Sequence, residues 1–113
     1  MGLDCFFVRH NPATDKLDEV TDLDWKGNPP NVCGGGESGS FRGKVYSEQI
    51  ELLTGLSLYD ELDNEQVGLI AAAIRRKVIN SIMDDTVPFD DLYDLWRMFK
   101  AYYEAGCSLE PWA

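Results

Sequence analysis

The segment Ser40-Phe41-Arg42-Gly43-Lys44-Val45-Tyr46 separates two different halves of the sequence. It closes a glycine-rich run, residues 34–39, and opens a half in which apolar residues recur at helical spacing. The half before it holds a short aromatic run and several turn signals, which are typical of strands and loops. In an extended backbone, Arg42 and Lys44 would share one face, opposite Phe41 and Val45.

The half before this segment predicts a sheet-forming region. Residues 3–8 are apolar and aromatic, and Asn11-Pro12 stops them, so they predict a buried strand. Residues 11–21 are polar and acidic and predict a solvated loop or hairpin. Residues 20–25 alternate weakly and predict an edge strand. Prolines and glycines then predict a mobile loop at about 27–40.

The half after it predicts three helices. Ser47 is expected to cap a short helix that ends at Gly55. Asp63 and Gln66 have the spacing of a capping box and predict a helix over 64–83. Its apolar face consists of Val67, Ile70, Ala71, Ile74, Val78 and Ile82. A third helix is predicted over about 88–105, with Gly106 as its C-terminal cap.

These elements predict one α+β domain over residues 1–113. Residues 107–112 form an extended tail that can pair with the N-terminal strand. We therefore expect a small sheet built from the two chain ends, covered by two long antiparallel helices and one short helix. A chain of 113 residues is long enough to form a hydrophobic core without metals or disulfides.

Charge restricts the classes of partner. The formal net charge is −10, so the phosphates of DNA or RNA and anionic membranes would be repelled. No run of about twenty apolar residues is present, so no membrane span is expected, and Asp4 and Arg9 argue against a signal peptide. The sequence predicts a cytoplasmic protein that does not bind nucleic acid directly.

Metal and catalytic motifs are weak. The three cysteines, Cys5, Cys33 and Cys107, contain no C-x-x-C pair, and a zinc site would need all three together with His10. We therefore expect reduced thiols, no metal and no cofactor. Nothing marks His10 or a thiol as part of a catalytic group, so no catalytic residue is assigned and we favour a protein without enzymatic activity.

Acidic residues form the first candidate site. Carboxylates beside helix N-termini have a structural explanation, because the helix end carries partial positive charge. They would also mimic nucleic-acid phosphates if they formed one surface, and would then occupy a basic partner. The candidate partner-binding residues are Asp60, Glu61, Asp63, Asp84, Asp85, Asp90 and Asp91.

The segment at 40–46 forms the second candidate site. Glycine-rich backbone, two cations and a nearby helix start can together hold an anion or nucleotide. The candidate ligand-binding residues are Arg42, Lys44, Gly39, Ser40 and Tyr46. The alternative is that the aromatic residues are core anchors and that the cations pair with surface acids. The run Arg75-Arg76-Lys77 splays around its helix and predicts a solvated surface.

Several short segments resemble a family of small uncharacterised proteins of bacteria and their phages. The resemblance rests on the opening MGLD, the central segment FRGKxY at 41–46, residues 54–59 and the ending at 106–112. It implies a phage or mobile-element accessory protein, and such proteins often bind and block host machinery.

Two functional hypotheses follow. The first is a non-enzymatic acidic protein that binds and inhibits a host protein in the host cytoplasm. The target would be a nucleic-acid-binding protein or a defence protein, and in the latter case the role would be anti-defence. The alternative is a binder or sequestering protein for a nucleotide or other anion near Arg42 and Lys44. A homo-oligomer stays open, with Trp25 and Trp112 as candidate interface residues.

Overall fold

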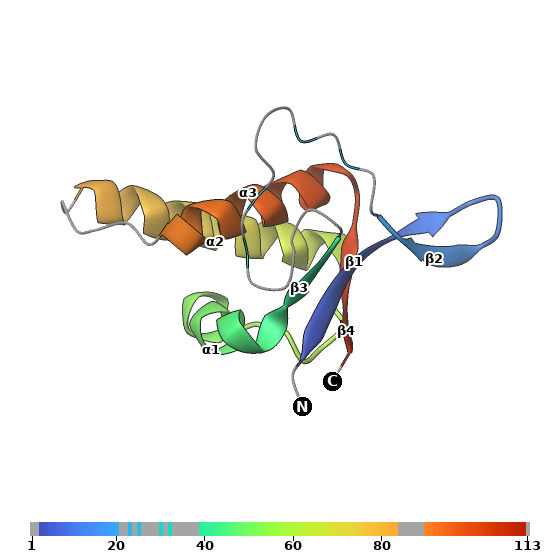
Figure 1. Ribbon diagram of the computed structural model, residues 1–113, viewed down its shortest axis with the longest axis horizontal. Coiled ribbons are helices and arrows are strands. Elements are labelled where there is room, and N and C mark those ends of the chain that lie inside the picture. The colour runs from blue at the N-terminus through green and yellow to red at the C-terminus, as the bar shows by residue number, and fades with distance from the viewer. Residues whose placement is uncertain are drawn as a thin grey trace.

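A computed structural model describes residues 3–20, 23, 25, 30, 32, 39–83 and 90–112, with side chains for all of these except 81–83 and 90–91. The fold is α+β, as the sequence predicts. Figure 1 shows its elements in chain order, which are β1 (Asp4–Asn11), β2 (Lys16–Glu19), β3 (Ser40–Arg42), α1 (Gly43–Thr54), α2 (Asn64–Met83), α3 (Asp90–Glu104) and β4 (Ser108–Trp112).

Strand β1 is the centre of the sheet. One of its edges pairs antiparallel with β3 at residues 4–6 and with β2 at residues 8–11. Its other edge pairs antiparallel with β4, so that Asp4 lies opposite Trp112 and Val8 opposite Ser108. The prediction that the two chain ends build the sheet is therefore confirmed. A bridge between Leu62 and Leu109 adds the connector before α2 to the outer edge of β4.

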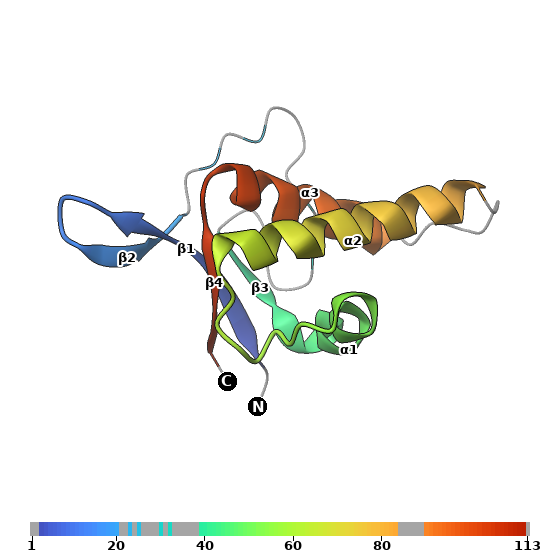
Figure 2. The same ribbon diagram turned by 180° about the vertical axis from the view of Figure 1, so that it is seen from behind.

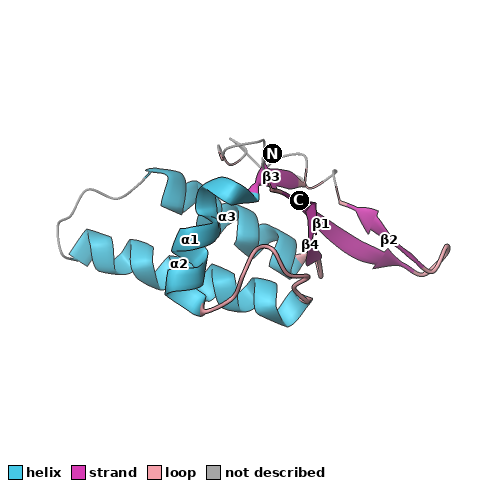
Figure 3. Cartoon of the chain, turned by 90° about the horizontal axis from the view of Figure 1, so that it is seen from below, coloured by secondary structure: helices cyan, strands magenta, loops and turns pink. Residues whose placement is uncertain are grey.

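The helices cover one face of this sheet (Figures 1 and 3). On β1, Cys5 and Phe7 are fully buried beneath them, whereas Asp4 is exposed on the other face. The ring of Phe7 stacks on Tyr102 of α3 with centroids 4.2 Å apart. The ring centroids of Phe41 and Phe99 lie 5.7 Å and 5.4 Å from that of Phe7, which places an aromatic cluster at the centre of the core.

The predicted start of α2 and the predicted C-terminal cap of α3 are confirmed. Asp63 and Gln66 form a reciprocal capping box, in which each backbone N–H donates to the other side chain at 2.9 Å and 2.8 Å. Helix α3 ends at Glu104, and Gly106, whose φ is +81°, lies in the cap that follows it. Cys107 N–H donates to Tyr102 C=O and Gly106 N–H to Tyr103 C=O, the two bonds of a Schellman motif. Figure 2 shows α2 running antiparallel to α3.

The predicted start of the first helix is wrong. Helix α1 begins at Gly43, and Ser47 is buried inside it. The backbone N–H of Lys44 donates to Leu3 C=O at 3.3 Å, so the residue just before β1 supplies an acceptor that a side-chain cap would otherwise provide. Arg42 and Lys44 were expected to share one face of an extended segment, opposite Phe41 and Val45. This alternation ends at Arg42, because Val45 lies in the helix and is 58% exposed.

The second strand differs in position from the prediction. It is Lys16–Glu19, within the segment expected to form a loop or hairpin. Among residues 20–25, only Val20, Leu23 and Trp25 are described, and none of these three lies in a strand. Most of the loop predicted at 27–40 lies outside the described residues.

The β1–β2 hairpin projects from the helix-covered part of the sheet (Figure 1). Every side chain from residues 12 to 19 is exposed. Asn11 Oδ1 accepts from Ala13 N–H at 3.0 Å, and Asn11 Nδ2 donates to Asp18 at 2.8 Å. These polar contacts order the turn without adding to the core.

Candidate functional site

The residues predicted to hold an anion are divided between core and surface. Tyr46 and Gly39 are buried, and the Tyr46 ring lies 6.2 Å from that of Phe41. Ser40 is half-buried, whereas Arg42 and Lys44 are exposed. Neither cation is among the described residues that line the pockets at the hairpin, beside the start of α2 or along α3.

Arg42 lies on the face of the sheet opposite the helices. The register places it beside Asp4, and Asp4 in turn lies opposite Trp112 on the other side of β1. Residues opposite one another in adjacent strands share a face. The structure therefore brings together two residues singled out for different reasons, the candidate ligand residue Arg42 and the candidate interface residue Trp112, which is 68% exposed.

The candidate partner-binding acids form two groups at opposite ends of the helix pair. Asp60, Glu61 and Asp63 are exposed beside the start of α2. Asp90 and Asp91 begin α3, and the end of α3 bonds to Asn64 at the start of α2. Because α3 has 15 residues, about 22 Å of helix separates these groups. Asp84 and Asp85, and the side chains of Asp90 and Asp91, lie outside the described part.

The first group of acids borders a pocket of about 300 Å³, which we call the acidic pocket. Its carboxylates are Glu61 and Asp63 from the connector and Glu110 from β4. It is completed by Leu17, Leu62, Gln66, Ser108 and Leu109. No Lys or Arg belongs to this set of described lining residues, so the local potential is negative beside an apolar surface.

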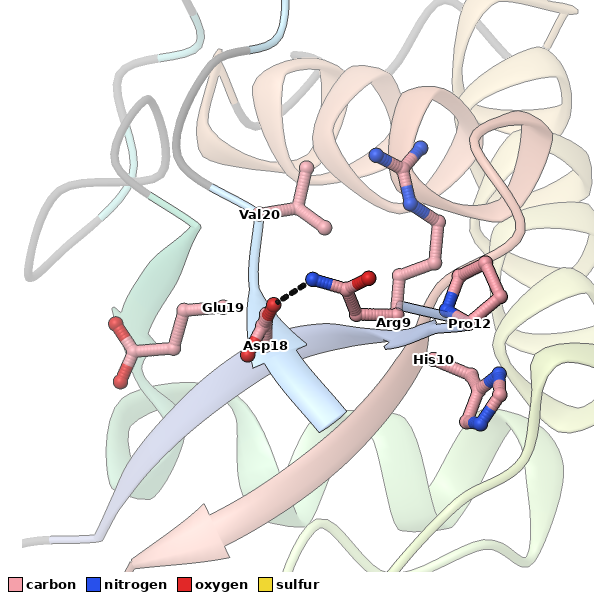
Figure 4. A pocket seen from close by; sticks show the side chains of 7 residues that line it. Arg9, His10, Pro12, Asp18, Glu19 and Val20 are labelled. Carbon is pink, nitrogen blue, oxygen red and sulfur yellow. Dashed lines mark hydrogen bonds between the residues drawn. The ribbon is translucent and has the colours of Figure 1, made fainter. Parts of the chain in front are cut away.

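A second pocket, of about 410 Å³, lies at the base of the hairpin (Figure 4). Arg9, Asp18 and Glu19 supply charges of both signs, and Val20 supplies an apolar wall. Figure 4 shows Arg9 and His10 pointing to opposite sides of β1. Arg9 donates to Ala105 C=O at 3.3 Å at the end of α3. One N–H group of the Arg9 guanidinium is thus already used in a hydrogen bond within the protein.

The histidine is paired with a carboxylate, and the two described cysteines are free and buried. Nε2 of His10 lies 2.8 Å from Oδ1 of Asp15, and both side chains are exposed. Burial, with a smaller contribution from the Asp4 carboxylate, raises the pKa of the Cys5 thiol to about 12. Burial also raises the pKa of Cys107, although Arg9 opposes this. At neutral pH both thiols are protonated, whereas a nucleophile requires thiolate.

Two negative observations apply to the described residues. No three of their His, Cys, Asp or Glu side chains converge as metal ligands would. None of the helices in this part of the chain has the length and apolar character required to cross a bilayer.

Sequence reasoning identified two of the three pocket acids and missed Glu110 and Leu17. Glu110 comes close to Glu61 because Leu109 pairs with Leu62 on one edge of β4 while β4 pairs with β1 on the other. The extended tail was predicted to pair with the N-terminal strand, which is the signal that could have placed Glu110. The bridge to Leu62 has no sequence signature.

Comparison with known proteins adds no family to these observations. No protein-family model matches the sequence, and no solved structure matches the fold.

Proposed function

We propose that the protein is a non-enzymatic binding protein that captures a basic segment of a partner protein at the acidic pocket. The observation that carries the proposal is that Glu61, Asp63 and Glu110 all line one pocket, which has no lining cation among the described residues. Complementary charge speeds association and selects against wrong partners.

The lining favours a lysine or arginine side chain of the partner. The aliphatic stem would pack on Leu17, whose side chain is 51% exposed, and the charged head would reach the carboxylates. Because phosphates would be repelled at the same place, the partner is a protein rather than a nucleic acid. A basic host protein of the nucleic-acid-binding or defence class, met in a host cytoplasm, has this chemistry.

The two described thiols and the histidine support a role without catalysis. Cys5 is fully buried and its pKa is raised to about 12, so this thiol does not act as a nucleophile at neutral pH. His10 is held by Asp15 on a projecting turn, outside the acidic pocket.

Two double variants of equal charge test the proposal. Glu61→Gln with Glu110→Gln removes two charges from the acidic pocket. Glu48→Gln with Glu51→Gln removes two exposed charges from α1 and is the matched control. In pull-downs from bacterial extract, a basic protein should be retained by the wild type and the control, lost at high salt, and lost from the pocket variant. Equal capture by both variants would exclude the acidic pocket.

The start of α1 supports a second candidate function, the binding of a small anion. Arg42 and Lys44 flank this helix start, no acidic residue lies in its first turn, and no side chain caps it. Helix N-termini favour anions. Thermal-shift measurements with mono-, di- and cyclic nucleotides should raise the melting temperature of the wild type but not of Arg42→Ala with Lys44→Ala. Unchanged melting of the wild type with every nucleotide would exclude this function.

A further inference from the structure

The outer surface of the α2–α3 pair carries a groove that neither candidate function uses. One pocket of about 400 Å³ is lined by Gly68, Ala71, Ala72, Arg75, Trp96, Lys100, Tyr103 and Glu104. A second, of about 290 Å³, is lined by Trp25, Tyr93, Trp96, Arg97, Lys100, Ala101 and Glu104. Trp96, Lys100 and Glu104 belong to both, so the pockets adjoin along α3. We call this surface the helical groove.

Aromatic rings form the walls of the helical groove. Trp96 is half-buried and lies 5.8 Å from Tyr93 between ring centroids. Tyr103 is 42% exposed, and a Cβ at Gly68 would overlap its ring. Gly68 therefore allows the Tyr103 ring to lie directly against the backbone of α2. Both rings keep part of their surface accessible, as a stacking site requires.

Cations line the same groove. Arg75 comes from α2 and Lys100 from α3, and both are exposed. Nζ of Lys100 lies 5.8 Å from the centre of the Trp96 ring and 3.1 Å from Oε1 of Glu104. Glu104 is the one carboxylate among the residues that line either pocket. In addition, the indole N–H of Trp25 is buried without a hydrogen-bond acceptor among the described residues.

We propose that the helical groove binds a small planar aromatic anion. Its ring would stack on Trp96 or Tyr103, and its phosphate or carboxylate would pair with Arg75 and Lys100. The net charge of −10 disfavours polyanions, but salt screens distant charges beyond about 10 Å, so the nearest cations dominate for a small ligand. The site is independent of the acidic pocket, since the two share no lining residue.

The test uses three probes that separate ring from charge: adenosine 5′-monophosphate, adenosine and inorganic phosphate. Titration of the ¹⁵N-labelled protein should shift amide resonances of α2 and α3 around Gly68, Arg75 and Lys100. The monophosphate should bind more tightly than either adenosine or phosphate alone. Resonances of α1 should stay unchanged, which distinguishes this site from the start of α1.

Variants at neighbouring positions make the test specific. Arg75→Ala should weaken binding of the monophosphate about tenfold, the effect of losing a charge-assisted hydrogen bond. Arg76→Ala is the matched control, because Arg76 is exposed on the same helix and is not among the lining residues; its binding should equal that of the wild type. Glu104→Gln should tighten binding about twofold to fivefold by freeing Lys100.

Three results would overturn the proposal: no shift in α2 and α3 at millimolar monophosphate, equal losses from Arg75→Ala and Arg76→Ala, or weaker binding to Glu104→Gln. A cooperative thermal melt of each variant would verify that the variant is folded. Arg75, Arg76 and Glu104 are all exposed, so these substitutions leave the core intact.

Discussion

The side-chain amide of Asn64 donates a hydrogen bond to the main-chain carbonyl of Cys107 at 2.8 Å. The same amide donates to Tyr103 C=O at 3.0 Å. One side chain at the first position of α2 thus satisfies two carbonyls at the end of α3. This contact fixes the sheet end of the helix pair, next to the acidic pocket.

Asn64→Ala should lower the free energy of unfolding by about 0.5–1.5 kcal/mol, since it removes the side-chain donor to Cys107 C=O, whereas Tyr103 C=O keeps the N–H of Gly106. Urea denaturation measures the change. Asn80→Ala is the control, because Asn80 is exposed late in the same helix and its replacement by a better helix former should not destabilise. Equal effects at both positions would show that the contact contributes nothing.

Gly43→Ala should destabilise by about 1–3 kcal/mol, because the added Cβ would overlap the Sγ of Cys5 in the buried core. Gly68→Ala should lower the free energy of unfolding by a smaller amount. The overlapping ring of Tyr103 is 42% exposed and can swing outward, and alanine gains about 1 kcal/mol of helix propensity over glycine. Denaturant midpoints compare the two variants, and a larger loss at Gly68 would contradict this explanation.

Stability should fall with rising pH because of Cys5. Burial raises the pKa of its thiol from an ordinary value of 9.0 to about 12. Between these values the unfolded chain releases the proton while the folded protein keeps it, so the unfolded state binds fewer protons. The thiol should therefore lower the free energy of unfolding by about 1.4 kcal/mol per pH unit above pH 9.

Urea titrations between pH 8 and 10.5, roughly the range in which the unfolded thiol ionises, give this slope. Cys5→Ala lacks the titrating group, so its stability should depend less on pH than that of the wild type. Parallel pH profiles would mean that the thiol ionises equally in both states. Since Cys5 Sγ also lies 3.7 Å from Leu58 C=O, only the slopes are compared and not the absolute stabilities.

Asp63 combines a capping role with a charge in the acidic pocket, and two substitutions separate them. Asp63→Asn keeps an acceptor for Gln66 N–H and should change stability little. Asp63→Ala removes the cap and should cost about 0.5–2 kcal/mol. Partner capture should weaken in both variants. If Asp63→Asn were as unstable as Asp63→Ala, the cap would depend on charge rather than on the acceptor.

Local signals predicted the parts of the fold that depend on local interactions. The capping box and the apolar face gave helix α2 its observed bounds, and Gly106 marked the end of α3. The start of α1 was not predictable in this way. Its cap is the carbonyl of Leu3, which is distant in sequence, and Ser47 has the chemistry of a cap but lies in the helix interior.

The acidic pocket was half predictable for a similar reason. Glu61 and Asp63 belong to a visible acidic cluster beside a helix start. Glu110 and Leu17 join them only through strand pairing between distant segments. The helical groove was missed because Arg75 belongs to a run whose spacing favours a solvated surface. Its neighbour Lys100 comes from another helix.

The pairing of β1 with β4 has a consequence for how the chain acquires its structure. The central strand precedes all the other elements described here, and one of its three partner strands, β4, is made only after both long helices. The hairpin and helices form from near contacts, but the sheet closes only through contacts of long sequence separation, which slow folding. A nascent chain lacking β4 therefore exposes an unpaired edge of β1, the stage at which it is most open to aggregation.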